Sequence, residues 1–468
     1  MTDTIPAQQS RNAPVEMLDQ LQSYFGDRCS LALSVRQQHG RDESIFDVAP
    51  PDAVIFVESS QDVAYAVSLA ASYKVPVIPY GAGSALEGQF LAVDGGICLD
   101  FSRMNKIINI STDDFTATVQ PGVTREQLNE ALRHDGLFFP VDPGANASIG
   151  GMTATRASGT STVRYATMRE NVLKLEVVTA SGEIIHTGTL ACKSSAGYDL
   201  TRLFVGSEGT LGVITEITLR LYPLPEAVSA AICSFPTIES AVRTTITAIQ
   251  MGIELSRCEF MDVNAVTAVN KADHAGLKVS PLLLMEFAGS PTAVREQAQT
   301  MAEIAQDLGG ENFEWAERPE ERNRLWKARH RAYLSGVQLR PGCRTVTTDV
   351  CVPISRLADS VLEAIKEANA SGLPYFAVGH VGDGNYHMCY LLDPASPQER
   401  EFAEKLSHQL VSRAIEVGGT CTGEHGIGLH KQGFLIEETG AGAVAMMRSI
   451  KHALDPDNIM NPGKVFSW

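Results

Sequence analysis

The sequence lacks paired cysteines. Its nine cysteines are scattered at positions 29, 98, 192, 233, 258, 343, 351, 389 and 421, and no two of them form a C-x-x-C motif. This pattern disfavours a disulfide framework, a zinc ribbon and an iron–sulfur cluster. The haem-attachment motif C-x-x-C-H is missing as well. We therefore expect a protein of a reducing compartment that carries neither haem nor cluster.

Long apolar runs and an excess of positive charge are also missing. No stretch reaches the ~18 uninterrupted apolar residues of a membrane-spanning helix, and the first residues lack the basic and apolar regions of a signal peptide. The 38 basic and 55 acidic residues leave a net charge of −17, which repels nucleic acid and anionic lipid. We expect a soluble cytoplasmic protein, at most peripheral at the inner face of a membrane, with no nucleic-acid partner.

Composition and length are those of a packed globular protein. The chain has 468 residues, 44% of them hydrophobic and 20% charged, which at ~100–200 residues per domain allows two or three domains. In the first half, the patterns predict a helix over 60–74 and a β-hairpin over 173–187. Thr124 and Gln127 have the spacing of a capping box at the start of another helix. Two prolines within 222–225 end this half.

The second half repeats one order of elements. The predicted order is strand 228–235, helix 237–251, strands 254–261 and 282–287, and helix 292–308, and it is roughly repeated over 345–417. Two split β-α-β units in tandem form one antiparallel sheet backed by helices. We therefore expect an α+β fold with a first domain over 1–222, a second over 223–425, and a C-terminal segment over 426–468.

Three glycine-rich segments stand out in the first half, at 79–89, 142–159 and 206–216. Glycines let backbone N–H groups approach an anion closely. The first segment is neither a G-x-G-x-x-G fingerprint nor a P-loop, which weakens an NAD or ATP interpretation. By itself it is equally well explained as a tight loop between strand and helix. Three such segments together favour an extended ligand with a pyrophosphate.

The glycine-rich segments resemble those of a known family. The stretches Pro79-Tyr-Gly-Ala-Gly-Ser and Gly206-Ser-Glu-Gly-Thr-Leu-Gly are similar to the FAD-binding domain of the vanillyl-alcohol-oxidase (PCMH) type flavoproteins. The stretches 379–387 and 423–428 resemble the FAD-linked D-2-hydroxy-acid dehydrogenases, and 348–353 most resembles their cytochrome-type D-lactate dehydrogenase members. The similarity runs from about position 51 to position 466. The resemblance implies that 1–222 is a PCMH-type FAD-binding domain and that 223–425 is a substrate, or cap, domain.

The resemblance implies FAD as cofactor and assigns its contacts. Residues expected around the pyrophosphate are Pro79, Tyr80, Gly81, Ala82, Gly83, Ser84 and Gly88. Residues expected along the flavin and ribityl chain are Pro143, Gly150, Gly151, Ser158 and Gly159. Residues expected at the adenine side are Glu208, Gly212 and Ile214, and Asn461 is expected at the isoalloxazine. No histidine or cysteine occurs in 79–89 or 142–166, where relatives tether FAD, so we expect a non-covalent flavin.

Two imidazoles and a carboxylate form a candidate metal site. His380, His387 and Glu424 supply a ligand set suited to Zn²⁺ or Mn²⁺ with open positions, and the resemblance supports it. The alternative is two ordinary histidines at the ends of a hairpin. His425 follows Glu424, and in an extended segment it points to the other face, so it is the candidate proton acceptor. The alternatives for His425 are a second metal ligand or an imidazole bonded to the loop.

One arginine of a predicted helix is the candidate partner of the substrate carboxylate. Arg329 matches the arginine that the family uses for this purpose, with Lys327 and Arg331 as competing choices and a solvated basic face as the alternative. Relatives that oxidise D-2-hydroxyglutarate have a lysine where this chain has Thr347. This departure favours lactate or longer aliphatic 2-hydroxy acids, with Trp326 or Tyr333 as a wall of the substrate pocket.

The expected function is oxidation of D-lactate and related D-2-hydroxy acids to 2-oxo acids by metal-assisted hydride transfer to FAD. Electrons would pass to a quinone, a cytochrome or an electron-transfer flavoprotein, and a homodimer remains open. The alternatives are a glycolate oxidase subunit, a D-2-hydroxyglutarate dehydrogenase, a metal-dependent hydrolase without redox chemistry, and a non-catalytic nucleotide-binding protein. Absorbance near 450 nm and its bleaching by hydroxy acids separate these classes.

Overall fold

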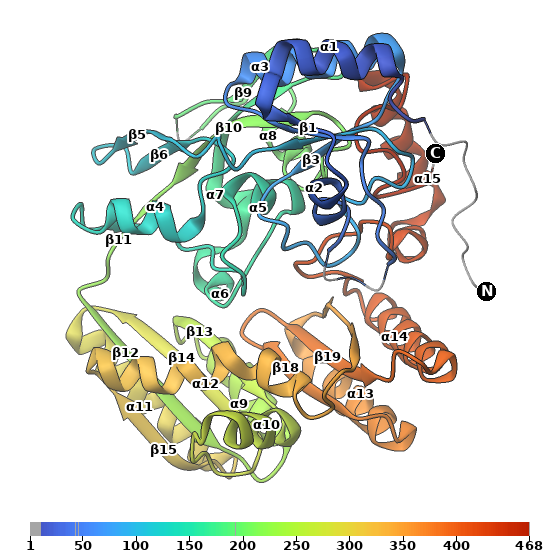
Figure 1. Ribbon diagram of the computed structural model, residues 1–468. Helices are drawn as coiled ribbons and strands as arrows, with labels where there is room; N and C mark the ends of the chain where they lie inside the picture. Colours follow the sequence, from blue (N-terminus) through green and yellow to red (C-terminus); the bar gives the residue numbers. More distant parts are fainter. Residues whose placement is uncertain (1–10, 43, 45, 192, 468) are drawn as a thin grey trace. The chain divides into compact units, whose positions relative to one another are not determined.

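The computed structural model describes residues 11–42, 44, 46–191 and 193–467. The start of the chain, in which we expected no leader, and Cys192 lie outside these ranges. The chain divides into two compact units (Figure 1). Unit 1 comprises Met1–Ser158, Thr167–Pro223 and Glu424–Trp468, and unit 2 comprises Gly159–Ala166 and Leu224–Gly423. Among the described residues, no helix combines the length and apolar character that crossing a membrane requires.

The described residues of unit 1 form a four-stranded sheet, a five-stranded sheet, a two-stranded sheet of β7 and β11, and the C-terminal helix. Its helices are α1 (Val15–Phe25), α2 (Leu33–Gln38), α3 (Ser60–Tyr73), α4 (Arg125–Leu132), α5 (Ile149–Thr155), α7 (Met168–Asn171), α8 (Leu200–Phe204) and α15 (Gln432–Leu454), with a 3-10 turn η1 (Gly26–Arg28). Its strands are β1 (Cys29–Ser30), β2 (Ala53–Phe56), β3 (Val77–Tyr80), β4 (Ile97–Asp100), β5 (Ile107–Ser111), β6 (Thr116–Val119), β7 (Leu137–Phe138), β8 (Val172–Val178), β9 (Ile184–Gly188), β10 (Val213–Arg220) and β11 (Tyr222–Pro223).

The first sheet of unit 1 has the order β1-β2-β4-β3 and ends at the first glycine-rich loop. Helix α3 confirms the predicted helix at 60–74. It begins after Ser59, whose side chain accepts a hydrogen bond from the backbone of Asp62, and ends at Lys74 in the left-handed conformation. Its apolar side packs into a core shared with β2, β3 and β4. Strand β3 is parallel to β4, so both deliver their carboxyl ends to the same edge.

The second sheet of unit 1 has the order β5-β6-β10-β8-β9, and all its pairs are antiparallel. Strands β8 and β9 form the predicted hairpin. Helix α4 has the predicted capping box, because the Thr124 side chain accepts from the Gln127 backbone while the Gln127 side chain accepts from the Thr124 backbone. Buried hydrophobic side chains from positions 117 to 221 form a core between this sheet and helices α4 and α5.

The C-terminal segment belongs to unit 1. Helix α15 is drawn in red (Figure 1), and Nζ of Lys451 on this helix donates to the carbonyl of Thr210 in unit 1 at 2.8 Å. It is interrupted at Gly440, whose φ of 81° is not helical. After the helix, Met460 forms a parallel bridge to Val77 of β3, and the backbone N–H of Asn461 donates to the carbonyl of Val77. The chain end therefore extends the first sheet next to the glycine-rich loop.

Unit 2 is one antiparallel sheet with helices on both faces. Its strands are β12 (Ala227–Ser234), β13 (Leu255–Met261), β14 (Leu282–Gly289), β15 (Glu311–Ala316), β16 (Arg344–Thr347), β17 (Val350–Cys351), β18 (Tyr375–His380) and β19 (Asn385–Leu392). Its helices are α6 (Thr162–Tyr165), α9 (Ile238–Gln250), α10 (Val263–Asp273), α11 (Pro291–Asp307), α12 (Pro319–Val337), α13 (Leu357–Ser371) and α14 (Pro397–Glu416), with a 3-10 turn η2 (Ile354–Arg356). The strand order is β15-β12-β14-β13-β18-β19-β16, with β17 also paired to β19.

The sheet of unit 2 confirms the predicted α+β class and most of the predicted elements. Helices α10 and α12 pack on one face of the sheet and share an apolar core with it. Met261, Val378 and Cys389 are among the strand residues whose side chains point into this core. Helix α10 and strand β15 were not expected from the sequence. The strand predicted over 345–352 is split into β16 and β17, because Thr348 between them turns its side chain to accept from the backbone N–H of Met388.

The chain passes from one unit to the other four times. The breaks lie at Pro223/Leu224, at Gly423/Glu424, and on both sides of the segment 159–166. That segment joins unit 2 because Arg164 donates to the backbone carbonyl of Ala288, with an N–O distance of 2.8 Å. Gly159 therefore lies in unit 2, although we expected it in the first domain. Glu424 and His425 lie in unit 1, although we expected them at the end of the second.

Candidate functional site

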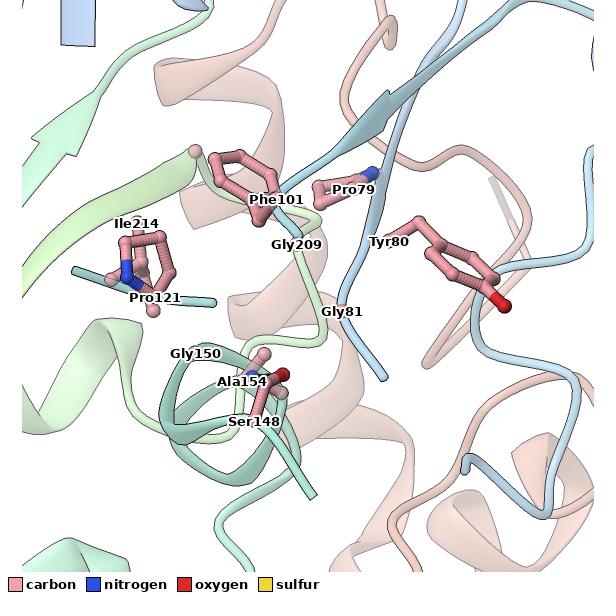
Figure 2. A pocket seen from close by; sticks show the side chains of 12 residues that line it. Pro79, Tyr80, Gly81, Phe101, Pro121, Ser148, Gly150, Ala154, Gly209 and Ile214 are labelled. Carbon is pink, nitrogen blue, oxygen red and sulfur yellow. Dashed lines mark hydrogen bonds between the residues drawn. The ribbon is translucent and has the colours of Figure 1, made fainter. Parts of the chain in front are cut away.

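A pocket in unit 1 lies where the glycine-rich segments come together (Figure 2). It is lined by Pro79, Tyr80, Gly81, Phe101, Pro121, Ser148, Gly150, Gly151, Ala154, Gly209, Gly212 and Ile214. These residues come from the carboxyl end of β3, the residue after β4, the turn after β6, helix α5 with the residue before it, and the turn before β10 with the start of that strand. Segments that are more than 100 positions apart in the sequence therefore form one surface.

Two glycines let the walls of this pocket approach one another. A Cβ atom on Gly81 would clash with the Ser148 hydroxyl. A Cβ atom on Gly150 would lie 2.5 Å from the Cβ of Pro121 and 2.9 Å from its carbonyl oxygen. The clash at Gly150 involves the ring and backbone of Pro121, so glycine is required there, whereas the clash at Gly81 involves a single side-chain hydroxyl. A wall made of backbone, small side chains and the N-terminus of α5 fits a long phosphate-containing cofactor.

The pocket brings together seven of the sixteen residues predicted to bind the flavin. The seven are Pro79, Tyr80, Gly81, Gly150, Gly151, Gly212 and Ile214. The other nine, which do not line it, are Ala82, Gly83, Ser84, Gly88, Pro143, Ser158, Gly159, Glu208 and Asn461. Sequence reasoning missed Phe101, Pro121, Ser148, Ala154 and Gly209. A signal existed for three of them, since Ser148, Ala154 and Gly209 lie within the glycine-rich segments 142–159 and 206–216. Phe101 and Pro121 closely follow β4 and β6, two strands that were not predicted from the sequence.

Glu208 and Asn461 hold other parts of unit 1 in place. The Glu208 carboxylate accepts hydrogen bonds from the backbone N–H groups of Ile427, at 2.7 Å, and Gly428, at 2.9 Å. Burial raises the pKa of Glu208 to about 7, and the two N–H groups oppose that rise only in part. The Asn461 side chain donates to the carbonyls of Gln89, at 2.8 Å, and Glu208, at 2.7 Å. The two side chains tie the segment after Glu424 and the chain end to the glycine-rich loops.

Glu87 is a functional candidate that sequence reasoning missed. Its buried carboxylate lies 3.2 Å from Nδ1 of His425, 2.7 Å from Nδ1 of His430 and 3.0 Å from Nζ of Lys431. Burial alone would raise the pKa of Glu87, but Lys431 and the two histidines outweigh it and hold the pKa well below its usual range. Because a carboxylate only accepts, Nδ1 of His425 carries the proton, and Nε2 has the lone pair.

Other contacts within unit 1 hold Glu424 and His425. The amide of Gln89 donates to the carbonyl of His425 at 2.7 Å, which holds the backbone of the predicted base. The hydroxyl of Ser158 donates to Oε2 of Glu424 at 3.2 Å. Oε1 of Glu424 lies 4.0 Å from Nε2 of His425. Ser158, predicted to be near the flavin, is thus beside the predicted third metal ligand.

In unit 2, the two predicted metal-binding histidines share one face of the sheet. His380 ends β18, and His387 lies on β19 opposite Val378. Residues two apart on a strand, and residues directly opposite on neighbouring strands, point to the same side. His380, Val378 and His387 therefore face the same way, and the two imidazole centroids are 5.5 Å apart. The predicted strand–turn–strand arrangement is confirmed.

In each of the two histidines, Nδ1 contacts an oxygen atom, and this contact fixes the orientation of the imidazole. Nδ1 of His387 lies 3.0 Å from the carbonyl oxygen of Thr348, so it donates, and Nε2 has the lone pair. Nδ1 of His380 lies 2.8 Å from Oε1 of Glu259, which fixes the same tautomer. Metal-binding histidines typically donate their second nitrogen to a carbonyl or a carboxylate in this way. The geometry of unit 2 is thus compatible with a divalent cation held by Nε2 atoms.

Of the three basic residues considered for the substrate carboxylate, Arg329 is the one that lies against this face. Its side chain is 12% exposed, and its Nε lies 2.8 Å from Oε2 of Glu259. Arg331 instead pairs with Asp273, and its side chain is 45% exposed. Lys327 is exposed. Helix α12 therefore turns only Arg329 of the three toward the sheet, close to the partner of His380.

The two predicted pocket walls differ in burial. Trp326 lies one helical turn before Arg329 and is 4% exposed in the core of unit 2. Tyr333 is 42% exposed and makes a hydrogen bond to the Thr345 hydroxyl. The hydroxyl of Thr347, which occupies the position of the lysine found in relatives that oxidise dicarboxylates, donates a weak hydrogen bond to Sγ of Cys389 at 3.8 Å. Burial favours Trp326 over Tyr333 as a neighbour of the arginine.

Comparisons with known families cover both units. A family model described as FAD binding domain matches residues 51–188, and one described as FAD linked oxidases, C-terminal domain, matches residues 224–465. A probable mitochondrial D-lactate dehydrogenase of Danio rerio is 48% identical over 461 residues, covering 97% of this chain and 93% of that protein. The mitochondrial D-lactate dehydrogenase [cytochrome] of Arabidopsis thaliana is 43% identical over 466 residues, covering 99% of this chain and 82% of that protein.

The solved structures support the fold. The structure of p-cresol methylhydroxylase with bound substrate is similar with a TM-score of 0.77, covering 97% of this chain and 96% of that chain at 17% identity. At this identity the likeness concerns the fold only, and it confirms the predicted PCMH-type α+β architecture.

Proposed function

The chain belongs to the family of FAD-linked oxidases, with FAD as its cofactor, and from this membership we propose that it is a dehydrogenase that oxidises D-lactate and related D-2-hydroxy acids to 2-oxo acids. The observation that carries the proposal is the grouping of Arg329, His380 and His387 on one face of the unit 2 sheet, in a chain whose other unit has the flavin domain. Relatives named as D-lactate dehydrogenases, which align with almost the whole chain, support the substrate class.

FAD supplies the hydride acceptor when it is bound. The walls of the unit 1 pocket would hold it without a covalent bond, because neither histidine nor cysteine occurs among the residues that line the pocket. Arg329 would bind the substrate carboxylate with its guanidinium fork. Nε2 of His425 would accept the proton of the substrate hydroxyl, while Glu87 keeps the proton of His425 on Nδ1.

The proposed metal ligands are His380, His387 and Glu424, with Zn²⁺ or Mn²⁺ as the ion. A cation held by two imidazoles and one carboxylate would have open positions, polarise the hydroxyl group and lower its pKa. The tautomers of His380 and His387, both set by Nδ1 contacts, support their part of this ligand set. Glu424 directly follows Gly423, whose backbone N–H donates to the carbonyl of Asp349 with an N–O distance of 2.9 Å. Oδ1 of Asp349 lies 3.8 Å from Nδ1 of His387.

The electron acceptor is proposed from the names of relatives. Because several of them are called cytochrome-type enzymes, we propose a cytochrome as the external acceptor of this protein. Quinones and electron-transfer flavoproteins are the other acceptors to be compared in the same assay. A cytoplasmic location and a homodimer remain predictions from the sequence.

Anaerobic bleaching of the flavin tests the proposed function. The purified protein, with absorbance near 450 nm, is mixed with D-lactate, L-lactate, glycolate and D-2-hydroxyglutarate, each with and without a chelator. We expect D-lactate to bleach the flavin fastest, L-lactate to leave it oxidised, and chelation to slow the bleaching. A flavin that none of these acids bleaches would refute the proposal. Equal rates with glycolate or D-2-hydroxyglutarate would refute the preference for D-lactate.

A further inference from the structure

We propose that Glu259 is a positioning residue that sets up the metal ligand His380 and the carboxylate-binding Arg329 together. The inference rests on the proposed function, because it takes His380 and Arg329 in the roles given above. It goes beyond that function by coupling the two roles through one side chain. Affinity for the metal and affinity for the substrate carboxylate are then linked within unit 2.

The register of the sheet places Glu259 directly beside His380. Strand β13 pairs antiparallel with β18, with Phe260 opposite Gly379 and Met261 opposite Val378. One step further in the same register, Glu259 is opposite His380, so both side chains point to the same face. This is the face that helix α12 covers with Arg329. The proximity of the three groups is therefore built into strand register and helix packing.

Each oxygen of the Glu259 carboxylate has its own partner. Oε1 lies 2.8 Å from Nδ1 of His380, and Oε2 lies 2.8 Å from Nε of Arg329. The first contact keeps the His380 proton on Nδ1 and directs Nε2 toward a ligand. The second contact is an ion pair without hydrogen-bond geometry, because Nε of Arg329 and Oε2 of Glu259 are buried atoms for which the described residues offer no hydrogen-bond partner. It keeps the guanidinium beside Glu259 and leaves the two Nη nitrogens at the far end of the group, where they can address a carboxylate in a bidentate fork. One anionic group thus orients two functional side chains.

The burial of Glu259 argues against a purely stabilising role. Its side chain is 0% exposed, whereas the carboxylates of other arginine pairs in the same unit are 13% exposed at Asp273, 16% at Glu286 and 25% at Glu367. Burying an ion pair carries a desolvation penalty that often cancels its attraction, so it is weak support for stability. A fully buried carboxylate shared by two functional residues is better explained by the orientation it imposes.

The shared carboxylate predicts coupled defects. Removing its charge frees the imidazole of His380 to rotate or change tautomer, and it also releases the anchor of Arg329. When a metal-binding histidine loses the carboxylate that accepts from its other ring nitrogen, metal binding typically weakens ~10–100-fold. The same substitution should raise the KM for D-lactate, because the guanidinium is no longer held in place. FAD binding should not change, since all pocket residues lie in unit 1.

The test compares Glu259→Gln and Glu259→Asp with the control Glu367→Gln in the FAD-loaded protein. The control removes a charged partner of Arg413, held by two contacts of 2.7 Å, from helix α13 of the same unit. Affinity for Mn²⁺ and Zn²⁺ is measured by isothermal titration after chelation, together with KM and kcat for D-lactate, FAD content and melting temperature. We expect Glu259→Gln to weaken metal binding ~10–100-fold and to raise KM. The control should leave both at wild-type values.

The outcomes separate this inference from the proposed function. Metal affinity or KM at the wild-type value in Glu259→Gln would overturn the coupling. If that variant loses FAD or unfolds, Glu259→Asp decides, because its shorter side chain cannot reach both partners and should still change both constants. Unchanged constants in the aspartate variant would again overturn the inference. A wild-type protein that D-lactate bleaches but that binds neither cation would refute the metal site itself. A flavin that D-lactate does not bleach would refute the proposed function.

Discussion

The close approach of Gly81 to Ser148 allows a direct test of the pocket in unit 1. Gly81→Ala adds a methyl group that clashes with the Ser148 hydroxyl, while Ser148 Cβ lies 3.6 Å and the Gly151 nitrogen 3.7 Å from the new atom. The backbone of Gly81 is not in the left-handed region, so alanine brings no backbone strain. The whole effect should therefore come from the hydroxyl group. Removing that group restores ordinary van der Waals distances.

The expected magnitude follows from this geometry. Overpacking of a fitted site costs about 1–3 kcal/mol, which corresponds to a FAD dissociation constant ~5–150-fold higher if the pocket wall moves. Ser148→Ala alone loses the hydrogen bond that its hydroxyl accepts from the Gly151 backbone at the start of α5, a capping contact worth about 0.5–2 kcal/mol. The double variant loses the cap but avoids the clash. Its defect should therefore be smaller than the sum of the two single defects.

The assay is titration of the deflavinated protein with FAD, followed by flavin fluorescence, for the wild type, both single variants and the double variant. We expect the double variant to bind FAD more tightly than Gly81→Ala. The reasoning would be refuted if Gly81→Ala bound FAD as tightly as the wild type. It would also be refuted if the two defects added without coupling, since the clash would then not lie between these two groups.

Two further predictions concern the segment after Glu424. His425→Ala should retain FAD but slow flavin reduction by D-lactate ~10²–10⁴-fold in stopped-flow measurements. The control His430→Ala, which removes another contact of Glu87, should slow the reduction much less. Equal losses of rate in the two variants would show that His425 is not the base. The pKa of Glu208 is raised to about 7 from its usual 4.5, so the folded protein binds one more proton than the unfolded chain between pH 4.5 and 7. The protonated Glu208 side chain therefore contributes to stability at low pH, and this contribution is lost as the pH rises through 7. The melting temperature of the wild type should therefore fall more between pH 5.5 and 8 than that of Glu208→Gln, and parallel profiles would contradict this assignment.

Local patterns predicted much of the secondary structure correctly. The hairpin of β8 and β9 and the helix at 60–74 were recognisable because alternation and helical periodicity depend on neighbours in sequence. The capping box of Thr124 and Gln127 is equally local. Helix α10 and the break between β16 and β17 were missed. The break depends on the Thr348 side chain accepting from Met388, 40 positions away, which no local pattern contains.

The candidate site was predictable only in part. Histidines separated by a glycine-rich turn indicated two imidazoles on paired strands, and the structure has them there. The carboxylates that orient the functional groups carried no signal in the sequence. Glu87 meets His425 across 338 positions, and Glu259 meets His380 across 121. Both are ordinary glutamates until the fold buries them beside cationic or imidazole partners.

By itself, the sequence predicted the α+β class and the glycine-rich loops, and its resemblance to a known family indicated the family and marked the imidazoles and the arginine as candidates. These predictions depend on residues close together in the chain. Only the tertiary structure decided which carboxylate faces which imidazole, and that Arg329 rather than Arg331 is turned toward the sheet. The physical reason is that tautomers and anchored side chains depend on strand register and on helix packing, which bring together groups that the chain itself keeps far apart.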